Sequence, residues 1–428
     1  MVINDGVPPE PPQGVMMMRL RTAGLLLFLF LLLPGMFRAF AADSDLEKEF
    51  RREIALYRIR PDRSRSVRKD PDGLAVTGER FQAVVASFYD MLYPVPPSFL
   101  KRFKFKSVIF KDTVYDRDGG MFQHRVVGDD LFLDADLKEE QFYTNIFYLQ
   151  LRLMSRTNTV KWSKLNPDAF SYENARGNVT GRAKQKLEEV IADWDQYFVS
   201  RASMYSPEMD MAQFFTFLML RGPGSVSLIG GEYPVLKKKA EMMIDILTST
   251  KAVESGYMET ILAPDLTKLK TYSPEALSVR LYYEYSGRWR VPSYKNEAGE
   301  TVTPPVRKMT DDVEVAGRKV NPLILALTVN DMKLFRFLAE HKVDPNVSSP
   351  SGVSALVLAI RNNDPEQVKA LLENRANVSP EAARAGTASG VNSEIVKLMT
   401  PYLPGVKQMD DPSAKPKSKP AASGERKP

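Results

Sequence analysis

Residues 321–344, NPLILALTVNDMKLFRFLAEHKVD, align without a gap with residues 354–377, SALVLAIRNNDPEQVKALLENRAN. The offset is 33 positions throughout, and apolar, small and polar residues recur at matching places. Each segment has a short apolar run, an Asn-Asp pair and a second apolar run at helical spacing. The period therefore predicts two consecutive helix pairs joined by loops.

The period is that of an ankyrin repeat, and both segments resemble this family. The usual Thr-Pro-Leu-His opening is reduced to NPLI at 321–324 and SALV at 354–357, and a third, shorter unit follows around 393–398. The hallmark positions are Pro322, Leu323, Ala326, Asp331, Leu338, Leu356, Ala359, Asp364 and Leu371. The resemblance implies a helical stack over residues 316–404 that binds a protein or peptide through its concave face.

Two clear repeats and one degenerate repeat make a marginal stack, because a single repeat cannot bury its apolar face. We therefore expect the stack to lean on the domain before it. The alternative to partner binding is that the stack only caps this neighbouring domain.

Composition limits the chemistry of the chain. It has 428 residues, 43% of them apolar and 26% charged, which is typical of a soluble, globular protein of several domains. The absence of cysteine excludes disulfides, thiolate zinc sites and cysteine nucleophiles. The two histidines, His124 and His341, lie far apart in sequence, so we expect no cofactor and no multi-histidine metal site.

The net charge of +6 is concentrated towards the ends of the chain. Residues 412–428 alone hold five basic side chains and one acidic side chain. Nucleic-acid binding needs a basic surface on the folded part, so we predict no nucleic-acid partner. Residues 405–428, rich in Lys and Pro, are typical of a disordered tail.

The amino-terminal residues predict export. Arg19 and Arg21 precede the apolar run AGLLLFLFLLL at 23–33, and a Pro-Gly break and AFA at 39–41 follow. This order is typical of a signal peptide over residues 1–41, and the run is too short to span a bilayer. We expect a periplasmic or secreted chain with no integral membrane span after cleavage. The alternative is an uncleaved anchor that holds the chain outside the cytoplasm.

The region after this segment predicts a basic helical lead-in over residues 42–92 and an α-rich domain over 93–250. Strand-like residues near 107–110 and 130–133 indicate a small sheet, and residues 138–155 and 208–220 predict apolar helices. Residues 251–315 read as a connecting segment with a hairpin near 281–306. The predicted fold class is mainly α: an α+β amino-terminal domain followed by the helical repeats.

Several distinctive segments follow one another in this domain: PPSFL at 96–100, Gly119-Gly120, DLFLD at 130–134, Trp162, LNP at 165–167, FSY at 170–172, FVS at 198–200 and DMAQFF at 210–215. In this order they resemble the landmarks of a family of zinc-binding metallopeptidases of the gluzincin class. The resemblance covers about residues 93–247. It implies a His-Glu-x-x-His helix and a glutamate as the third zinc ligand.

At the matching positions this chain carries Thr144, Asn145, Tyr148 and Gln213. Neutral hydroxyls are poor zinc ligands, and an amide cannot act as a general base. The resemblance therefore implies a pseudoenzyme with no catalytic residue and no metal, unless the alignment is in the wrong register. A residual metal site from His124 with Asp129, Asp130, Asp134 and Asp136 is an alternative, and a solvated loop is the simpler account of these residues.

The sequence thus predicts a non-catalytic, exported protein-binding module. It recognises a protein or peptide partner through the ankyrin repeats, with a remnant peptidase cleft as a second candidate surface. An active hydrolase with a non-standard metal site and a purely structural envelope scaffold are the alternatives.

Overall fold

The computed structural model of the protein describes residues 60–61, 78–100, 107–111, 114–115, 121–122, 124–127, 130–150, 153–175, 181–225, 233–295, 299–304 and 306–403. The predicted signal peptide, about two thirds of the basic lead-in predicted over residues 42–92, and the basic tail lie outside these residues. The chain divides into two compact units. The first comprises Met1–Asp90 and Lys104–Leu137, and the second comprises Met91–Phe103 and Lys138–Pro428.

The first unit contains a four-stranded sheet and most of helix α3 (Gly78–Leu92). The strand order is β1 (Arg60–Pro61), β2 (Ser107–Lys111), β6 (Asp130–Asp134) and β5 (His124–Val127), with β5 antiparallel to β6 and the other pairs parallel. Strands β3 (Val114–Tyr115) and β4 (Met121–Phe122) form a separate antiparallel pair. The strands expected near 107–110 and 130–133 are confirmed as β2 and β6.

The apolar residues of β2 and β6 form the core of this unit. Residues 108–110 and 131–133 are all buried, which suits neighbouring strands at the centre of a sheet. Phe81 and Phe88 of α3 pack edge-on against Phe110, with ring centroids 6.2 and 5.2 Å away. Helix α3 therefore covers the sheet with one apolar stripe.

The second unit begins with a group of helices. They are α4 (Pro97–Leu100), α5 (Glu139–Tyr148), α6 (Arg156–Ser163), α7 (Tyr172–Ala175), α8 (Gly181–Ala192), η2 (Trp194–Gln196), η3 (Arg201–Met204), α9 (Pro207–Arg221) and α11 (Pro234–Ser249). Helices α5 and α9 pack against each other. Phe99 of α4 stacks on Phe215 of α9 at 5.2 Å, and Phe147 of α5 lies 5.0 Å from the same ring.

One predicted helix is confirmed and the other is shorter than expected. Helix α9 covers residues 208–220, beginning at Pro207 after the capping side chain of Ser206. The helix predicted over 138–155 ends at Tyr148. Just beyond the end of the helix, buried Gln150 donates its Nε2 hydrogen to the carbonyl oxygen of Phe99 at 2.6 Å.

The segment between residues 251 and 315 contains helices α12 (Tyr257–Leu262) and α13 (Pro274–Tyr285) and the short η4 (Leu266–Lys268). The antiparallel pairs β7 (Tyr294–Lys295) with β8 (Thr301–Val302) and β9 (Val313–Val315) with β10 (Arg318–Val320) follow. Residues 281–285 of the region expected as a hairpin belong to α13, and β7 and β8 form a hairpin after it. Leu266, Leu277 and Leu281 lie in the same apolar core as the repeats.

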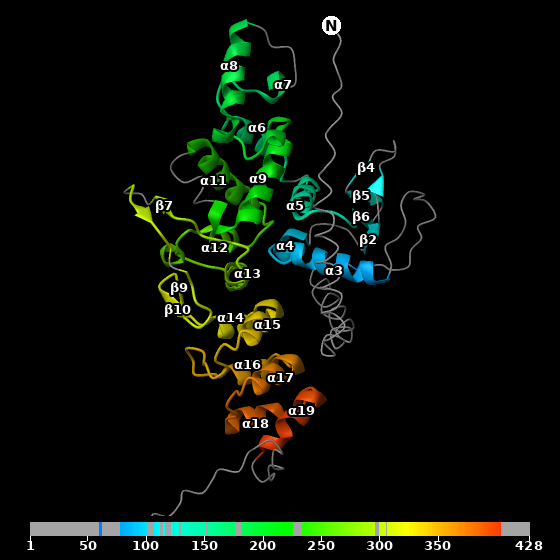
Figure 1. The fold of residues 1–428 in the computed structure, drawn as a ribbon, viewed down its shortest axis with the longest axis vertical. Helices are drawn as coiled ribbons and strands as arrows, with labels where there is room; N and C mark the ends of the chain where they lie inside the picture. Colours follow the sequence, from blue (N-terminus) through cyan, green and yellow to red (C-terminus); the bar gives the residue numbers. More distant parts are fainter. Residues whose placement is uncertain are drawn as a thin grey trace, which may run out of the picture. The chain divides into compact units, whose positions relative to one another are not determined.

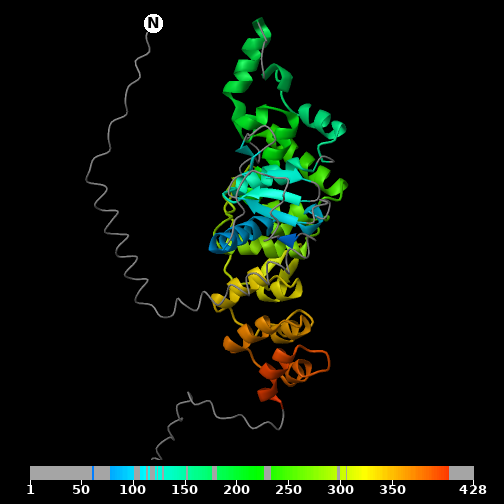
Figure 2. The same ribbon diagram turned by 90° about the vertical axis from the view of Figure 1, so that its right-hand side faces the viewer.

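Three helix pairs complete the second unit. They are α14 (Pro322–Thr328) with α15 (Met332–Glu340), α16 (Ala355–Arg361) with α17 (Pro365–Glu373), and α18 (Pro380–Gly386) with α19 (Ser393–Met399), followed by η5 (Thr400–Tyr402). The pairs follow one another in chain order, from yellow to red (Figure 1, Figure 2). The fold is mainly α, as predicted.

The repeat period arises from matching turns and caps. Asn330 and Asn363 both have a φ of 55°, a left-handed conformation that asparagine tolerates better than most residues. Asp331 and Asp364 follow them, and each carboxylate accepts two backbone N–H groups at the start of α15 or α17. The asparagine therefore forms the turn after one helix, and the aspartate caps the start of the next helix.

Asp331 also attaches the stack to the helices before it. Its Oδ1 atom caps α15, while its Oδ2 atom accepts hydrogen bonds from Tyr93 Oη and Ser278 Oγ, both at 2.6 Å. Lys333 Nζ lies 4.7 Å from the centroid of the Tyr93 ring and 5.0 Å from that of Tyr282. The first repeat therefore leans on the preceding helices, as expected for a short stack.

No helix in the part of the chain that the structure describes combines the length and the apolar character needed to cross a bilayer.

The β9–β10 hairpin provides a stability test. Its two-residue loop, Ala316 and Gly317, has φ values of 49° and 70°, as in a type I′ turn that favours Asn-Gly. We predict that Ala316→Asn raises the free energy of unfolding by about 0.5–1 kcal/mol, because asparagine is strained less than alanine in this conformation. Urea unfolding followed by circular dichroism measures the change. Ala388→Asn, in an exposed turn without positive φ, is the control and should give no gain, and a loss of stability in Ala316→Asn would contradict the turn assignment.

Candidate functional site

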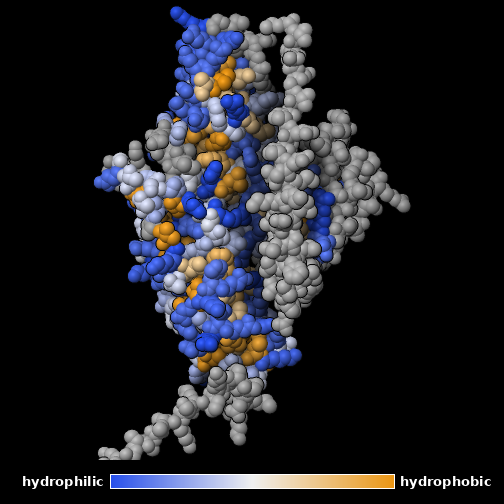
Figure 3. Space-filling view, in the orientation of Figure 1, coloured by the Kyte–Doolittle hydropathy of each residue, from blue (hydrophilic) through white to orange (hydrophobic). Residues whose placement is uncertain are grey.

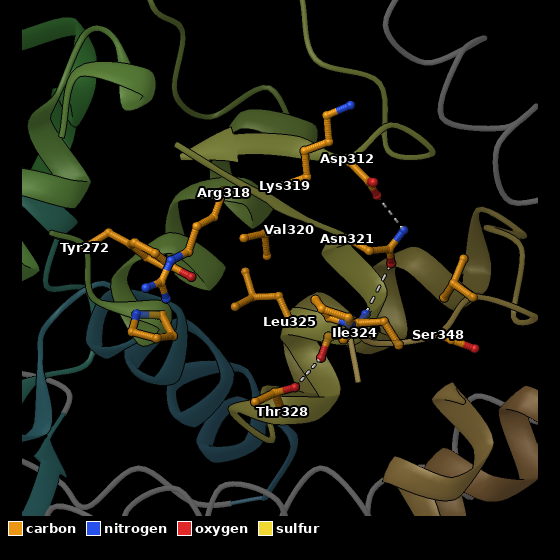
Figure 4. A pocket seen from close by; sticks show the side chains of 13 residues that line it. Tyr272, Asp312, Arg318, Lys319, Val320, Asn321, Ile324, Leu325, Thr328 and Ser348 are labelled. Carbon is orange, nitrogen blue, oxygen red and sulfur yellow. Dashed lines mark hydrogen bonds between the residues drawn. The ribbon is translucent and has the colours of Figure 1, made fainter. Parts of the chain in front are cut away.

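A groove runs along the first repeat and the loop that precedes the second. Its volume is about 870 Å³, and we call it the repeat groove (Figure 4). It is lined by Tyr272, Pro274, Asp312, Arg318, Lys319, Val320, Asn321, Ile324, Leu325, Thr328, Val347, Ser348 and Pro350. These residues come from the start of α13, the β9–β10 hairpin, α14 and the loop before α16.

Asn321 connects the hairpin to the helix in this groove. Its Oδ1 atom accepts the backbone N–H groups of Leu323 at 3.0 Å and Ile324 at 3.3 Å, and so caps α14. Its Nδ2 group donates to Asp312 Oδ1 at 3.2 Å (Figure 4). The tight β9–β10 turn and this cap fix the side chains of residues 318–320 beside the first helix of the repeat.

The floor of the groove is apolar and its edge is charged. Ile324 and Leu325 are 6% and 4% exposed, and half-buried Val320 and Val347 extend the apolar floor. Arg318 and Lys319 are exposed. The face of the molecule in Figure 3 likewise shows separate apolar patches, in orange, among hydrophilic residues in blue.

The structure brings together two of the four residues at the predicted remnant site. Gln213 Nε2 donates to Thr144 Oγ1 at 3.2 Å across the packed helices α5 and α9, and Thr144 Oγ1 lies 2.8 Å from Thr216 Oγ1. Ser200 Oγ donates to Gln213 Oε1 at 3.2 Å. The Gln213 amide therefore has a partner at each end.

The other two residues are not part of this hydrogen-bonded group. The Nδ2 atom of Asn145 is buried without a partner among the described residues. Tyr148 is 39% exposed at the end of α5. Tyr148 shares a helix face with Thr144, one turn away, because residues four apart lie one above the other.

The neutral group at this crossing does not fit zinc. Zinc in proteins is held by thiolate, imidazole or carboxylate ligands, and Thr144, Thr216 and Gln213 provide only hydroxyls and an amide that already bond one another. No cluster of three histidine, cysteine or acidic side chains able to hold a metal ion occurs among the residues that the structure places. The side chains of His124 and Asp129, from the alternative metal site, lie outside the description, and Asp136 pairs with Arg80 at 3.3 Å.

Sequence reasoning missed a buried ion pair beside this crossing. Asp210 Oδ2 accepts hydrogen bonds from Lys239 Nζ at 2.6 Å, Trp162 Nε1 at 2.7 Å and Tyr172 Oη at 2.7 Å. Asp210 and Lys239 are fully buried. Burial lowers the pKa of Lys239, and the Asp210 carboxylate only partly offsets this.

Five of the segments that suggested the metallopeptidase resemblance contribute residues to this ion pair and its surroundings. Asn166 Nδ2 donates to Tyr172 Oη at 2.9 Å, and Lys239 Nζ lies 4.2 Å from the centroid of the Phe198 ring. Burial, with the Asp210 charge next in size, raises the pKa of Tyr172 well above its usual range. Trp162, LNP, FSY, FVS and the DMAQFF helix therefore contribute to one buried structural centre. Only Lys239 gave no sequence signal.

The ankyrin hallmark residues occupy structural positions. Pro322 begins α14, and Asp331 and Asp364 cap α15 and α17. The other hallmark residues are all buried: Leu323, Ala326, Leu338, Leu356, Ala359 and Leu371. None of them lines the repeat groove, so they support the binding surface rather than forming it.

The buried ion pair predicts a strong effect of one substitution. Lys239→Met should lower the free energy of unfolding by about 3–5 kcal/mol, because it leaves the Asp210 charge buried without its cation. Adding Asp210→Asn should recover part of the loss, since the remaining partner is then neutral. Lys238→Met, at an exposed position of the same helix, should stay within about 0.5 kcal/mol of the parent chain in urea unfolding. An equally small effect of Lys239→Met would show that the pair carries no net stability.

Comparisons with known proteins identify the ankyrin repeats and no other part of the chain. Residues 302–382 match the family described as "Ankyrin repeats (3 copies)". No curated protein matches the chain, and no solved structure does. The matched residues include the β9–β10 hairpin and the helices from α14 to α17, and end inside α18. Residues 302–382 of this chain therefore contain ankyrin repeats, which suggests a protein-binding module.

Proposed function

We propose that the chain is an exported, non-catalytic protein that binds a partner protein or peptide in the repeat groove. The observation that carries this proposal is the groove itself, with a volume of about 870 Å³ and an apolar floor at Ile324 and Leu325 beside exposed polar and charged side chains. Binding sites commonly combine an apolar surface with a few polar groups that fix orientation. Export is supported by the signal-peptide-like sequence of residues 1–41. The exported chain is periplasmic or secreted, or it is held outside the cytoplasm by an uncleaved anchor.

The α5–α9 crossing supports the absence of peptidase activity as part of the same proposal. Thr144 and Gln213 meet across the helices, as zinc ligands of a gluzincin would, yet they are neutral and bond each other. A hydrolase with a non-standard metal site would need charged ligands there. We infer that hydrogen bonds have replaced a metal ion at this crossing.

A purely structural scaffold is the remaining alternative, and deleting the repeats cannot test it. Leu266, Leu277 and Leu281 share one core with the repeats, so truncation at Asn321 would expose apolar surface and unfold part of the second unit. Point substitutions inside the groove test binding without this defect.

We predict that Ser348→Trp abolishes partner capture. Ser348 is exposed and lines the groove, so a bulky ring there fills the space that a partner needs. The experiment compares proteins retained by the full chain and by the variant from an extract of the source cells. Ser389→Trp, at an exposed position outside the groove, is the matched control and should capture the same proteins as the parent chain. Equal capture by Ser348→Trp and the parent would contradict binding in the groove.

A second prediction concerns the former metal site. The combination Thr144→His, Asn145→Glu, Tyr148→His and Gln213→Glu should bind one zinc ion per chain, because Thr144 already meets Gln213 and lies one turn from Tyr148. Elemental analysis after dialysis measures the zinc. The variant that keeps Gln213 but carries the other three changes should bind at least about tenfold more weakly, because it lacks one ligand. A folded quadruple variant without zinc would mean that the resemblance to metallopeptidases is misleading.

A further inference from the structure

The edge of the repeat groove carries two cations on one strand. Arg318 and Lys319 are consecutive residues of β10, both are exposed, and both line the groove (Figure 4). Neither forms an ion pair with any residue in the described part of the chain. Their charges are therefore available to a partner.

Two acidic residues lie near these cations without an ion pair to them in the described part of the chain. Asp312 is the one acidic side chain among the lining residues, and its Oδ1 atom accepts a hydrogen bond from Asn321. Glu314 lies opposite Lys319 in the β9–β10 ladder, but the described residues show no ion pair between the two side chains. The lining therefore has an excess of positive charge at the hairpin and apolar surface below it.

The apolar floor lies close to this charged edge. Val320 follows Lys319 directly, and Ile324 and Leu325 lie on the next helix. The groove continues to Val347 and Ser348 in the loop before α16, so its lining comes from two successive repeats. Successive side chains of an extended segment point in opposite directions. An extended occupant can therefore direct one set of side chains to the cations at the edge and the other set to the apolar floor.

We infer that the segment recognised by the repeat groove is an extended acidic stretch of a partner protein, in which carboxylate and apolar side chains alternate. The carboxylates pair with Arg318 and Lys319, and the apolar side chains cover Ile324 and Leu325. This inference rests on the proposed function, because it concerns the same groove. The chain's own residues 412–428 do not have this chemistry, since they carry five basic side chains and one acidic side chain.

The test uses the full chain and three labelled peptides of equal length that alternate leucine with glutamate, with serine or with lysine. Fluorescence anisotropy should show the glutamate peptide binding about tenfold more tightly than the serine peptide. A tenfold difference in Kd is about 1.4 kcal/mol, or about 0.7 kcal/mol for each of two exposed ion pairs. The lysine peptide should bind most weakly. The advantage of glutamate should shrink as salt is added, because exposed charges are screened.

Charge reversal tests which residues select the peptide. Arg318→Glu with Lys319→Glu should reverse the order, so that the lysine peptide binds more tightly than the glutamate peptide. Arg384→Glu with Lys397→Glu changes the net charge equally at exposed positions outside the groove, and it should keep the original order. Circular dichroism of both variants checks that each is folded.

The outcomes separate this inference from the proposed function. Acidic recognition would be overturned, and groove binding left intact, if the glutamate and serine peptides bound equally. The same holds if both charge-reversed variants lost the preference for the glutamate peptide to the same extent. The absence of binding by all three peptides would also overturn it. If Ser348→Trp leaves the binding of every peptide and the capture of partners unchanged, the groove itself is not the binding site.

Discussion

The repeats depend on a carboxylate that they share with the helices before them. One oxygen of Asp331 caps α15, and the other accepts the hydroxyl groups of Tyr93 and Ser278. A single ankyrin repeat cannot bury its apolar face alone, so the first repeat of a short stack needs a partner on its amino-terminal side. Helix α13 provides that partner through Leu277 and Leu281, which belong to the same core as the repeats. Helix α14, which lines the repeat groove, packs against α13, and the β9–β10 hairpin is attached separately through the N–H group of Ala316, which donates to the carbonyl oxygen of Leu266 at 3.2 Å.

The repeats were predictable because their local rules recur. Asn330 and Asn363 adopt the same left-handed conformation, and the aspartates after them make the same cap, so the 33-residue period locates α14 to α17. The central strands β2 and β6 and helix α9 were likewise recognisable, from apolar runs and, for α9, from a proline with acidic residues beside it at the helix start. The role of α12 and α13 in the repeat core was not predictable, because these helices carry no copy of the period. The end of α5 at Tyr148, and the contact of Gln150 with residue 99 just after it, are not indicated by any local sequence pattern.

The candidate sites were predictable to different degrees. The pairing of Thr144 with Gln213 followed from a family resemblance, since no spacing rule links positions on two separate helices. Asp210 lies in one of the segments that carried the resemblance, but its partner Lys239 is one of three consecutive lysines on α11, two of them exposed. Only the packing distinguishes the buried lysine from its neighbours. Similarly, Arg318 and Lys319 lie in a hairpin outside the aligned repeat segments, so their place at the groove edge required the three-dimensional fold.

The attachment at Asp331 also limits how the array can lengthen during evolution. Helix α14 packs against α13 on one side. A new unit inserted there would have to supply a carboxylate that accepts the hydroxyl groups of Tyr93 and Ser278. Helices α18 and α19 pack on α16 and α17, and beyond them only η5 follows within the described chain. Duplication of a unit at that end would preserve every hydrogen bond of the junction. Growth of this array by gene duplication is therefore directional, with additions favoured at the carboxy-terminal end.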